Sequence, residues 1–259
     1  MDSRVCFVLF IFILVDTCLY KFIIIRRLLS YLSFEIVSYT IHKHHPMPNI
    51  FRFSGDLAHL VSILILIHSV ETKKSAKSIS LKTQILYALV FITRYLNLLT
   101  FDFSGSLYNT LLKIIFIGTT FYSIYIIKKY TKQITQYVDD FQISYILIPC
   151  FILSLIFNYK FTILEICWSF SLWLESVCIL PQLFMLQNQG EGDLLTIHYI
   201  FALGLYRALY IPNWIYRYYY EERFDIISVS AGIIQTLVYS DFFYIYYNKV
   251  IKNGLKLPQ

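Results

Sequence analysis

Charged residues are scarce in this sequence. Only 15% of its 259 residues are Asp, Glu, Lys or Arg, whereas 58% are hydrophobic and 19% are aromatic. Soluble domains contain about 25% charged residues, so the composition excludes an ordinary soluble domain and indicates membrane lipid as a partner. The net charge of +6 comes from basic residues that are divided among short loops and the tail. Because these residues form no single basic stripe, a nucleic-acid partner is excluded as well.

Paired cysteines and metal-ligand spacings are also missing. The five cysteines lack the spacing of a disulfide framework or a zinc site, and no Ser/His/Asp order or Cys/His pair is present. We therefore predict that the chain is not an enzyme and that it needs no metal or cofactor. The cysteines lie within apolar runs, where we expect buried free thiols, and they are Cys6, Cys18, Cys150, Cys167 and Cys178.

Long apolar runs, in contrast, fill most of the chain. A membrane-spanning helix needs about 20 apolar residues, and these runs are too long for buried strands, so helices are favoured over a barrel. We predict an all-α membrane protein with a seven-helix core over residues 47–248 and a tail over residues 249–259. The runs lie at residues 5–25, 50–70, 83–101, 106–127, 141–158, 162–187, 196–218 and 224–248.

Residues 1–46 differ from the rest and form a hydrophobic and basic N-terminal extension. The apolar run 5–25 is followed by a basic stretch, and the segment ends at Pro46-Met47-Pro48. Three alternatives remain open for this extension. It is an additional span, a signal-like segment that lacks a basic n-region, or a stretch that precedes a true start at Met47.

Basic residues in the short loops predict how the core crosses the membrane. Lysines follow the first, third and last core helices, and such residues mark the cytosolic side. The alternate connections hold fewer basic residues, which are opposed by acidic ones, so we expect a core N-terminus on the lumenal or exterior side and a cytosolic C-terminus. The lysines are Lys73, Lys74, Lys77, Lys82, Lys128, Lys129, Lys132, Lys249, Lys252 and Lys256.

Five ionisable residues lie inside the apolar runs. A charge held in hydrocarbon costs at least ~2.5–3.5 kcal/mol, so such residues usually face a protein interior or a watery cavity and mark a functional site. The set predicts a polar, arginine-rich pocket within the helical core. Its members are Arg94, Glu165, Glu175, Arg207 and Asp241.

Helical spacing places several polar residues on common faces. Arg52, Asp56 and His59 follow one another at spacings of four and three. For His59, a packing role competes with a role as proton sensor, because an imidazole has an ordinary pKa of ~6.5. An interfacial anchor is the alternative role for Arg52 and Arg217. Two further polar faces comprise Glu165, Trp168 and Glu175, and Tyr206, Tyr210, Asn213, Trp214 and Arg217.

An ordered set of short motifs runs through residues 49–252. They are Asn49-Ile50-Phe51-Arg52, Gly55-Asp56, His59, Arg94-Tyr95-Leu96, Leu164-Glu165, Leu174-Glu175-Ser176-Val177, Ile179-Leu180-Pro181-Gln182-Leu183-Phe184-Met185, His198-Tyr199, Phe201-Ala202-Leu203-Gly204, Tyr206-Arg207, Asn213-Trp214-Ile215 and Asp241-Phe242-Phe243-Tyr244. In this order they resemble the ER lumen protein retaining receptors, or KDEL receptors. So many motifs in one order make a chance similarity improbable.

The resemblance implies both a fold and a task. The implied fold has two three-helix bundles joined by a linking helix, similar to SWEET and PQ-loop proteins. The implied task is pH-dependent capture, in the Golgi, of escaped ER residents by their C-terminal Lys/His-Asp-Glu-Leu tetrapeptide. The COPI coat would be the second partner, and the protein would cycle between the cis-Golgi and the endoplasmic reticulum.

The resemblance also implies which residues bind the three carboxylates of such a ligand. Arg94 with Tyr95 would bind the terminal carboxylate, and Arg52 would bind the ligand Glu. Arg217 with Trp214 would bind the ligand Asp. Guanidinium suits these contacts because its planar fork pairs bidentately with a carboxylate.

The first ligand residue would meet a different part of the implied site. Glu165 and Trp168 would receive its cationic side chain, and Tyr210 belongs to the same peptide-binding set. Asn97 stands where the family commonly has Asp, which removes a negative charge from this region. We therefore expect a preference shifted away from Lys, toward His or a non-basic first residue.

Two further groups of residues are implied to act in switching and transport. His59 would be the pH sensor, and a hydrogen bond between Glu175 and Tyr206 would accompany closure of the site. Lys249 and Lys252 would be presented to the coat. A residue of the last helix, Asp241, belongs to the same transport set.

A small-solute transporter of the SWEET or PQ-loop type is the alternative function. The seven-helix plan and Pro181-Gln182 support it, and these two residues also predict a hinge near the cytosolic end of their helix. Against this alternative, three arginines directed at one pocket suit an anionic peptide end better than a neutral sugar.

Overall fold

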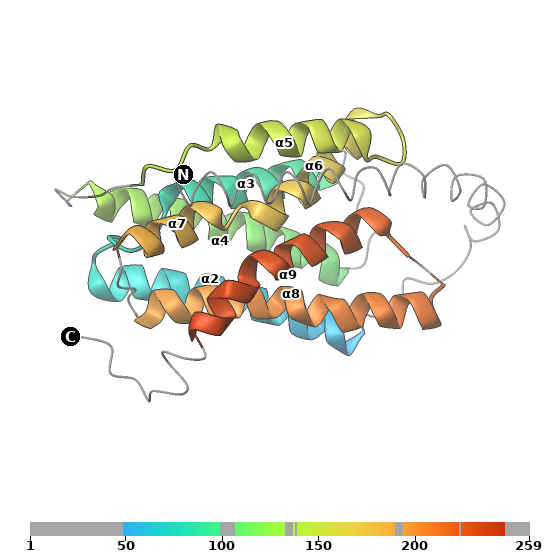
Figure 1. Ribbon diagram of the computed structural model, residues 1–259. Coiled ribbons are helices and arrows are strands. Elements are labelled where there is room, and N and C mark those ends of the chain that lie inside the picture. Colours follow the sequence, from blue (N-terminus) through green and yellow to red (C-terminus); the bar gives the residue numbers. More distant parts are fainter. Residues whose placement is uncertain are drawn as a thin grey trace. The chain divides into compact units, whose positions relative to one another are not determined.

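The computed structural model describes residues 49–98, 107–132, 137, 139–189, 194–222 and 224–246. The predictions for the extension 1–46 and the tail 249–259, including Lys249 and Lys252, lie outside these residues, as do the side chains of Asn97 and Asp241. Every described element is helical (Figure 1), which confirms the all-α prediction. The arrangement as two three-helix bundles, and the domain boundaries, stay predictions.

The described helices follow the predicted apolar runs. Five segments are long and apolar enough to cross a membrane, at Ile50–Lys73, Tyr108–Thr131, Ile163–Gln189, Leu194–Tyr220 and Ile226–Tyr244. This pattern is that of a multi-span membrane protein. In chain order the elements are α2 (Ile50–Lys73), α3 (Leu81–Arg94), η2 (Leu96–Leu98), α4 (Leu107–Thr131), α5 (Ser144–Ile156), α6 (Ile163–Val177), α7 (Leu180–Gln189), α8 (Leu194–Tyr220) and α9 (Ile226–Tyr246).

One predicted helix is divided in the structure. The run 162–187 forms α6 and α7, with a turn at Cys178 and Ile179 between them. Pro181 lies in the first turn of α7, where its missing N–H leaves no hydrogen bond unmade. The residue before a proline is also biased away from helical backbone angles, so the sequence favours a break close to this point.

Buried hydrogen bonds fix α7 to the start of α3. The Gln182 side chain donates to the Ser78 carbonyl at 2.8 Å and accepts from the Ser80 N–H at 2.8 Å. The backbone N–H of Gln182 donates to the Thr83 hydroxyl at 3.0 Å. Nearby, the Tyr137 hydroxyl donates to the Ile79 carbonyl at 2.9 Å. Burial raises the pKa of Tyr137, so this hydroxyl keeps the proton that it donates.

Packing between the helices encloses polar side chains and turns apolar ones outward. α2 packs along α8, and α9 packs against both α6 and α8 (Figure 1). Ile148 and Phe151 are more than half exposed, whereas Glu175, Arg207 and Gln235 are buried. An apolar exterior around a core that also holds charged side chains suits a protein whose solvent is lipid.

Candidate functional site

A cavity of about 320 Å³ lies among α2, α3, α4, α6, α8 and α9. It brings together most of the site residues predicted from the sequence. Those residues are Arg52, His59, Arg94, Tyr95, Trp168, Glu175, Tyr206, Tyr210, Trp214 and Arg217. The other lining residues are Asp56, Phe91, Phe116, Leu172, Arg207, Asn213, Phe224, Asp225, Ser228 and Val229.

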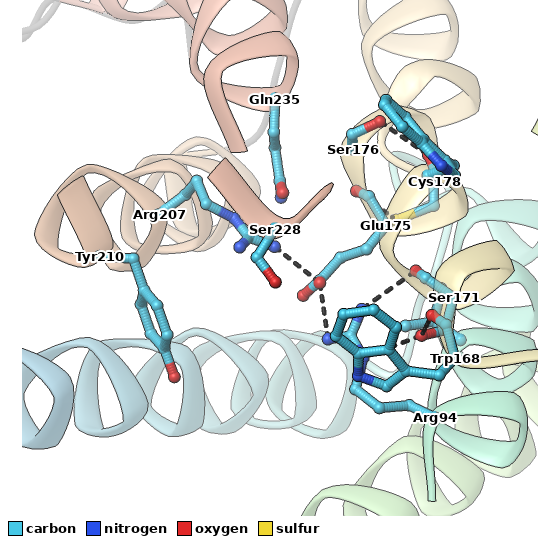
Figure 2. Close-up of polar contacts among 12 residues, drawn as sticks. Arg94, Trp168, Ser171, Glu175, Ser176, Cys178, Arg207, Tyr210, Ser228 and Gln235 are labelled. Atoms are coloured by element: carbon cyan, nitrogen blue, oxygen red, sulfur yellow. Dashed lines mark hydrogen bonds and ion pairs between the residues drawn. The ribbon is translucent and has the colours of Figure 1, made fainter. Parts of the chain in front are cut away.

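Glu175 of α6 is the centre of the charged wall (Figure 2). Its Oε2 atom lies 2.6 Å from Arg94 Nη1 and 2.6 Å from Arg207 Nη2. Its Oε1 atom accepts a hydrogen bond of 2.6 Å from the Tyr206 hydroxyl. One carboxylate therefore faces two guanidinium groups, which leaves this wall with a net positive charge. Arg207, one of the five charged residues that predicted a polar pocket, therefore has Glu175 as its buried partner.

Arg94 is held by α6 on a second side. Its Nε atom donates to the Ser171 hydroxyl at 3.1 Å, and its Nη2 atom donates to the Ser171 carbonyl at 3.0 Å. The side chain is 17% exposed, so part of the guanidinium faces the cavity. These contacts fix the orientation of the fork, which reduces the entropy lost when an anion binds to it.

Asp56 and its partners form a second polar group at the cavity. Its carboxylate accepts hydrogen bonds from the hydroxyls of Tyr108 at 2.9 Å and Tyr210 at 2.5 Å. Arg52 lies one helical turn away, with its Nε atom 3.9 Å from Asp56 Oδ2, and donates to Asn109 at 2.7 Å. The sequence placed Arg52 and Asp56 on one face but assigned no role to Asp56.

His59 is buried between aromatic rings. Its ring centroid lies 4.3 Å from that of Tyr206, with the ring planes 8° apart, and 4.8 Å from that of Phe116. Tyr206 in turn donates to Glu175. The predicted sensor and the predicted Glu175–Tyr206 hydrogen bond are therefore in direct contact, although their role as a switch stays a prediction.

Glu165 is not among the residues that line the cavity, and its predicted role in binding the ligand stays a prediction. Glu165 shares a helix face with Trp168, but among these two only Trp168 lines the cavity. Asp225 lines it as well, accepting a 2.8 Å hydrogen bond from the Tyr159 hydroxyl and capping the first turn of α9. Partial burial, with Asp225 nearby, raises the pKa of Tyr159, so that hydroxyl remains a donor.

Helices that enclose an arginine-rich cavity within an apolar exterior define a multi-span membrane protein with an internal polar cavity. Residues 75–217 match the sequence profile of the family described as ER lumen protein retaining receptor. The chain is 61% identical over 223 residues to the ER lumen protein-retaining receptor of Kluyveromyces lactis, covering 82% of this chain and all of that protein. It is 57% identical over 219 residues to that of Saccharomyces cerevisiae, with 82% of this chain and all of that protein covered. For the receptor of Drosophila melanogaster the identity is 47% over 212 residues, covering 81% of this chain and 99% of that protein.

The chain belongs to the ER lumen protein retaining receptor family. This confirms the resemblance inferred from the ordered motifs. The family consists of retention receptors, so the chain is a receptor and not an enzyme, as predicted. It is a membrane protein of the secretory pathway.

Proposed function

We propose that the cavity binds the C-terminal Lys/His-Asp-Glu-Leu-type tetrapeptide of escaped ER residents and thereby retrieves them. The observation that carries this proposal is the placement of Arg52, Arg94 and Arg217 around one cavity of about 320 Å³. The ligand presents three carboxylates, and each arginine offers a planar fork for one of them. The relatives are named for retaining proteins of the ER lumen, which supports the same ligand class.

Arg94 is the group best prepared for the terminal carboxylate. It is partly exposed to the cavity, and its fork is fixed by Ser171 and Glu175. When a ligand carboxylate pairs with Arg94, Glu175 keeps the Arg207 guanidinium and the Tyr206 hydroxyl as partners. Binding therefore adds a second anion to a wall that has two cations, instead of leaving a buried carboxylate unpaired.

The part of the cavity lined by Trp168 and Asp225 supplies the surroundings for the first ligand residue. Trp168 offers an aromatic face to a cation, Glu165 keeps its proposed role beside it, and Asp225 adds a carboxylate that lines the cavity. Asn97 keeps its predicted role as the neutral residue that weakens a preference for Lys.

Binding of labelled tetrapeptides to the purified full chain tests the proposed function. At pH ~5.5 we expect a peptide ending in His-Asp-Glu-Leu to bind, and its C-terminal amide to bind at least about tenfold more weakly, because the terminal charge is lost. Peptides that start with Lys should not bind clearly better than those that start with His. Equal affinity for the free acid and the amide would contradict the proposal.

His59 is proposed to couple binding to protonation. The charged groups that act on its ring are Glu175, Arg207 and Arg94. If binding takes up a proton on this ring, affinity is high in the acidic Golgi and falls as the pH rises toward that of the ER. We expect the wild type to bind about tenfold more tightly at pH ~5.5 than at pH ~7.2.

The variant His59→Phe removes the titrating nitrogens but keeps an aromatic ring beside Tyr206 and Phe116. We expect the ratio of affinities at the two pH values to fall to about twofold or less. His68→Phe is the matched control, because His68 is an exposed histidine on the same helix. The sensor role is wrong if His59→Phe keeps the full ratio or if His68→Phe loses it.

The proposal extends to traffic between the Golgi and the ER in COPI vesicles. We place the core N-terminus in the lumen and the C-terminus in the cytosol, in ER and cis-Golgi membranes. Figure 1 shows the C-terminal ends of α2 and α4, which carry Lys73, Lys128 and Lys129, at the same end of the bundle. This supports the orientation. Asp241, Lys249 and Lys252 keep their proposed role in transport. The alternative function, a small-solute transporter, is not favoured by membership of the receptor family.

A further inference from the structure

Gly232 of α9 lies directly against a wall residue of the cavity. A Cβ atom added to it would lie 2.7 Å from Cζ3 and 2.8 Å from Cζ2 of Trp214, and closer still to Cη2. Real Cβ atoms essentially never show contacts under 3.0 Å, so the benzo ring of Trp214 occupies space that exists only because residue 232 has no side chain. Trp214 itself lines the cavity, whereas Gly232 is not among the lining residues.

α9 is anchored on both sides of this contact. On one side, Asp225 accepts a hydrogen bond from Tyr159 and caps the helix. On the other side, Gln235 donates to the buried hydroxyl of Tyr206 at 3.2 Å. A side chain at position 232 would therefore displace the tryptophan ring more readily than the helix backbone.

The direction of that displacement follows from the neighbours of Trp214. Its ring packs against Tyr210 at 6.2 Å with an interplanar angle of 62°, and Tyr210 is fixed by its hydrogen bond to Asp56. Trp214 lines the cavity, so the ring can move into it. A displaced Trp214 would enter the volume that the ligand needs.

We propose that Gly232 is a positioning residue that sets the place of the Trp214 ring, and with it the width of the cavity beside Arg217. The residue acts through Trp214 without touching the ligand. This inference rests on the proposed function, because it assigns the width of the cavity to peptide recognition.

The test is peptide affinity of the purified full chain at pH ~5.5, measured for Gly232→Ala in two backgrounds. In the natural background we expect at least about tenfold weaker binding of a His-Asp-Glu-Leu peptide. Phe lacks the outer ring of the indole, whose atoms would clash with the added methyl group. Adding Gly232→Ala to Trp214→Phe should therefore change affinity by no more than about twofold relative to Trp214→Phe alone. Gly118→Ala is the matched control, because no heavy atom lies within 4 Å of its added Cβ.

Two outcomes would overturn the inference. One is unchanged affinity of Gly232→Ala in the natural background, and the other is an equal loss in both backgrounds. If Gly232→Ala does not fold, the double variant decides, since it folds only if the conflict with the Trp214 ring is the cause.

A second measurement separates this inference from the proposed function. In a protein that carries Trp168→Phe and Trp173→Phe, the tryptophan fluorescence, excited selectively over that of the tyrosines, comes from Trp214 alone. We expect Gly232→Ala to shift its emission maximum and Gly118→Ala to leave it unchanged, whether or not a peptide binds. A wild type that fails to bind peptide refutes the proposed function, whereas an unshifted emission refutes the role of Gly232.

Discussion

Replacing Glu175 with Ala is expected to lower the free energy of unfolding by about 3–5 kcal/mol, because removing one partner of a buried ion pair leaves an uncompensated charge. Here two guanidinium groups, those of Arg94 and Arg207, lose the same partner. The Tyr206 hydroxyl loses its acceptor as well. Thermal unfolding of the detergent-purified chain measures the effect.

The control for this prediction is Asp140→Ala, which removes a carboxylate that is exposed. We expect its stability to stay close to that of the wild type, as for most surface substitutions. Adding Arg207→Met to Glu175→Ala should restore part of the loss, because one of the unpaired charges is removed. If Glu175→Ala unfolds no earlier than Asp140→Ala, the central ion cluster does not stabilise the fold.

Replacing Arg94 with Ala is expected to weaken binding of a His-Asp-Glu-Leu peptide by about 100-fold or more, because a partly buried charge pair to the ligand is lost. The fold should persist, since Glu175 retains Arg207 and Tyr206 as partners. Affinity at pH ~5.5 and thermal stability, measured on the same preparation, separate the two effects.

Two further variants accompany this prediction: Arg94→Lys is the conservative replacement, and Lys160→Ala is the control. Lysine keeps the charge but lacks the planar fork, so we expect an intermediate loss of affinity. Lys160 is an exposed cation outside the cavity lining, and its replacement should leave affinity unchanged. Wild-type affinity in Arg94→Ala would remove the main support for carboxylate recognition by the cavity.

The sequence predicted most of the features that lie within single helices. Apolar runs predicted where the described helices lie, and five of the described segments have the length that lipid requires of a span, whereas α3 and α5 are shorter. The cost of a charge in hydrocarbon identified Arg94, Glu175 and Arg207 as site residues, and all three line the cavity. Spacings of three and four placed Arg52, Asp56 and His59 on one face, which is the face that meets the cavity.

Periodicity could not show which residues of different helices meet. It grouped Glu165 with Trp168 and Glu175, but it gave no sign that Asp225, just before α9, lines the same cavity as Trp168. Nor could it identify the partner of Arg207, because an ion pair between α6 and α8 depends on how these helices pack. The sequence predicted a hinge at Pro181-Gln182 but not the end of α6 at Val177, because apolar composition continues through Cys178, while buried hydrogen bonds of Gln182 fix the new helix.

The sequence by itself therefore determined that this chain is a helical membrane protein with charges that need an interior, since composition and the cost of burying charge depend on residue type alone. Only the tertiary structure decided the partners of those charges. It also decided the role of Gly232, because a missing side chain becomes informative only when a neighbouring ring occupies its place. Such contacts join residues that are distant in sequence, so local sequence patterns do not predict them.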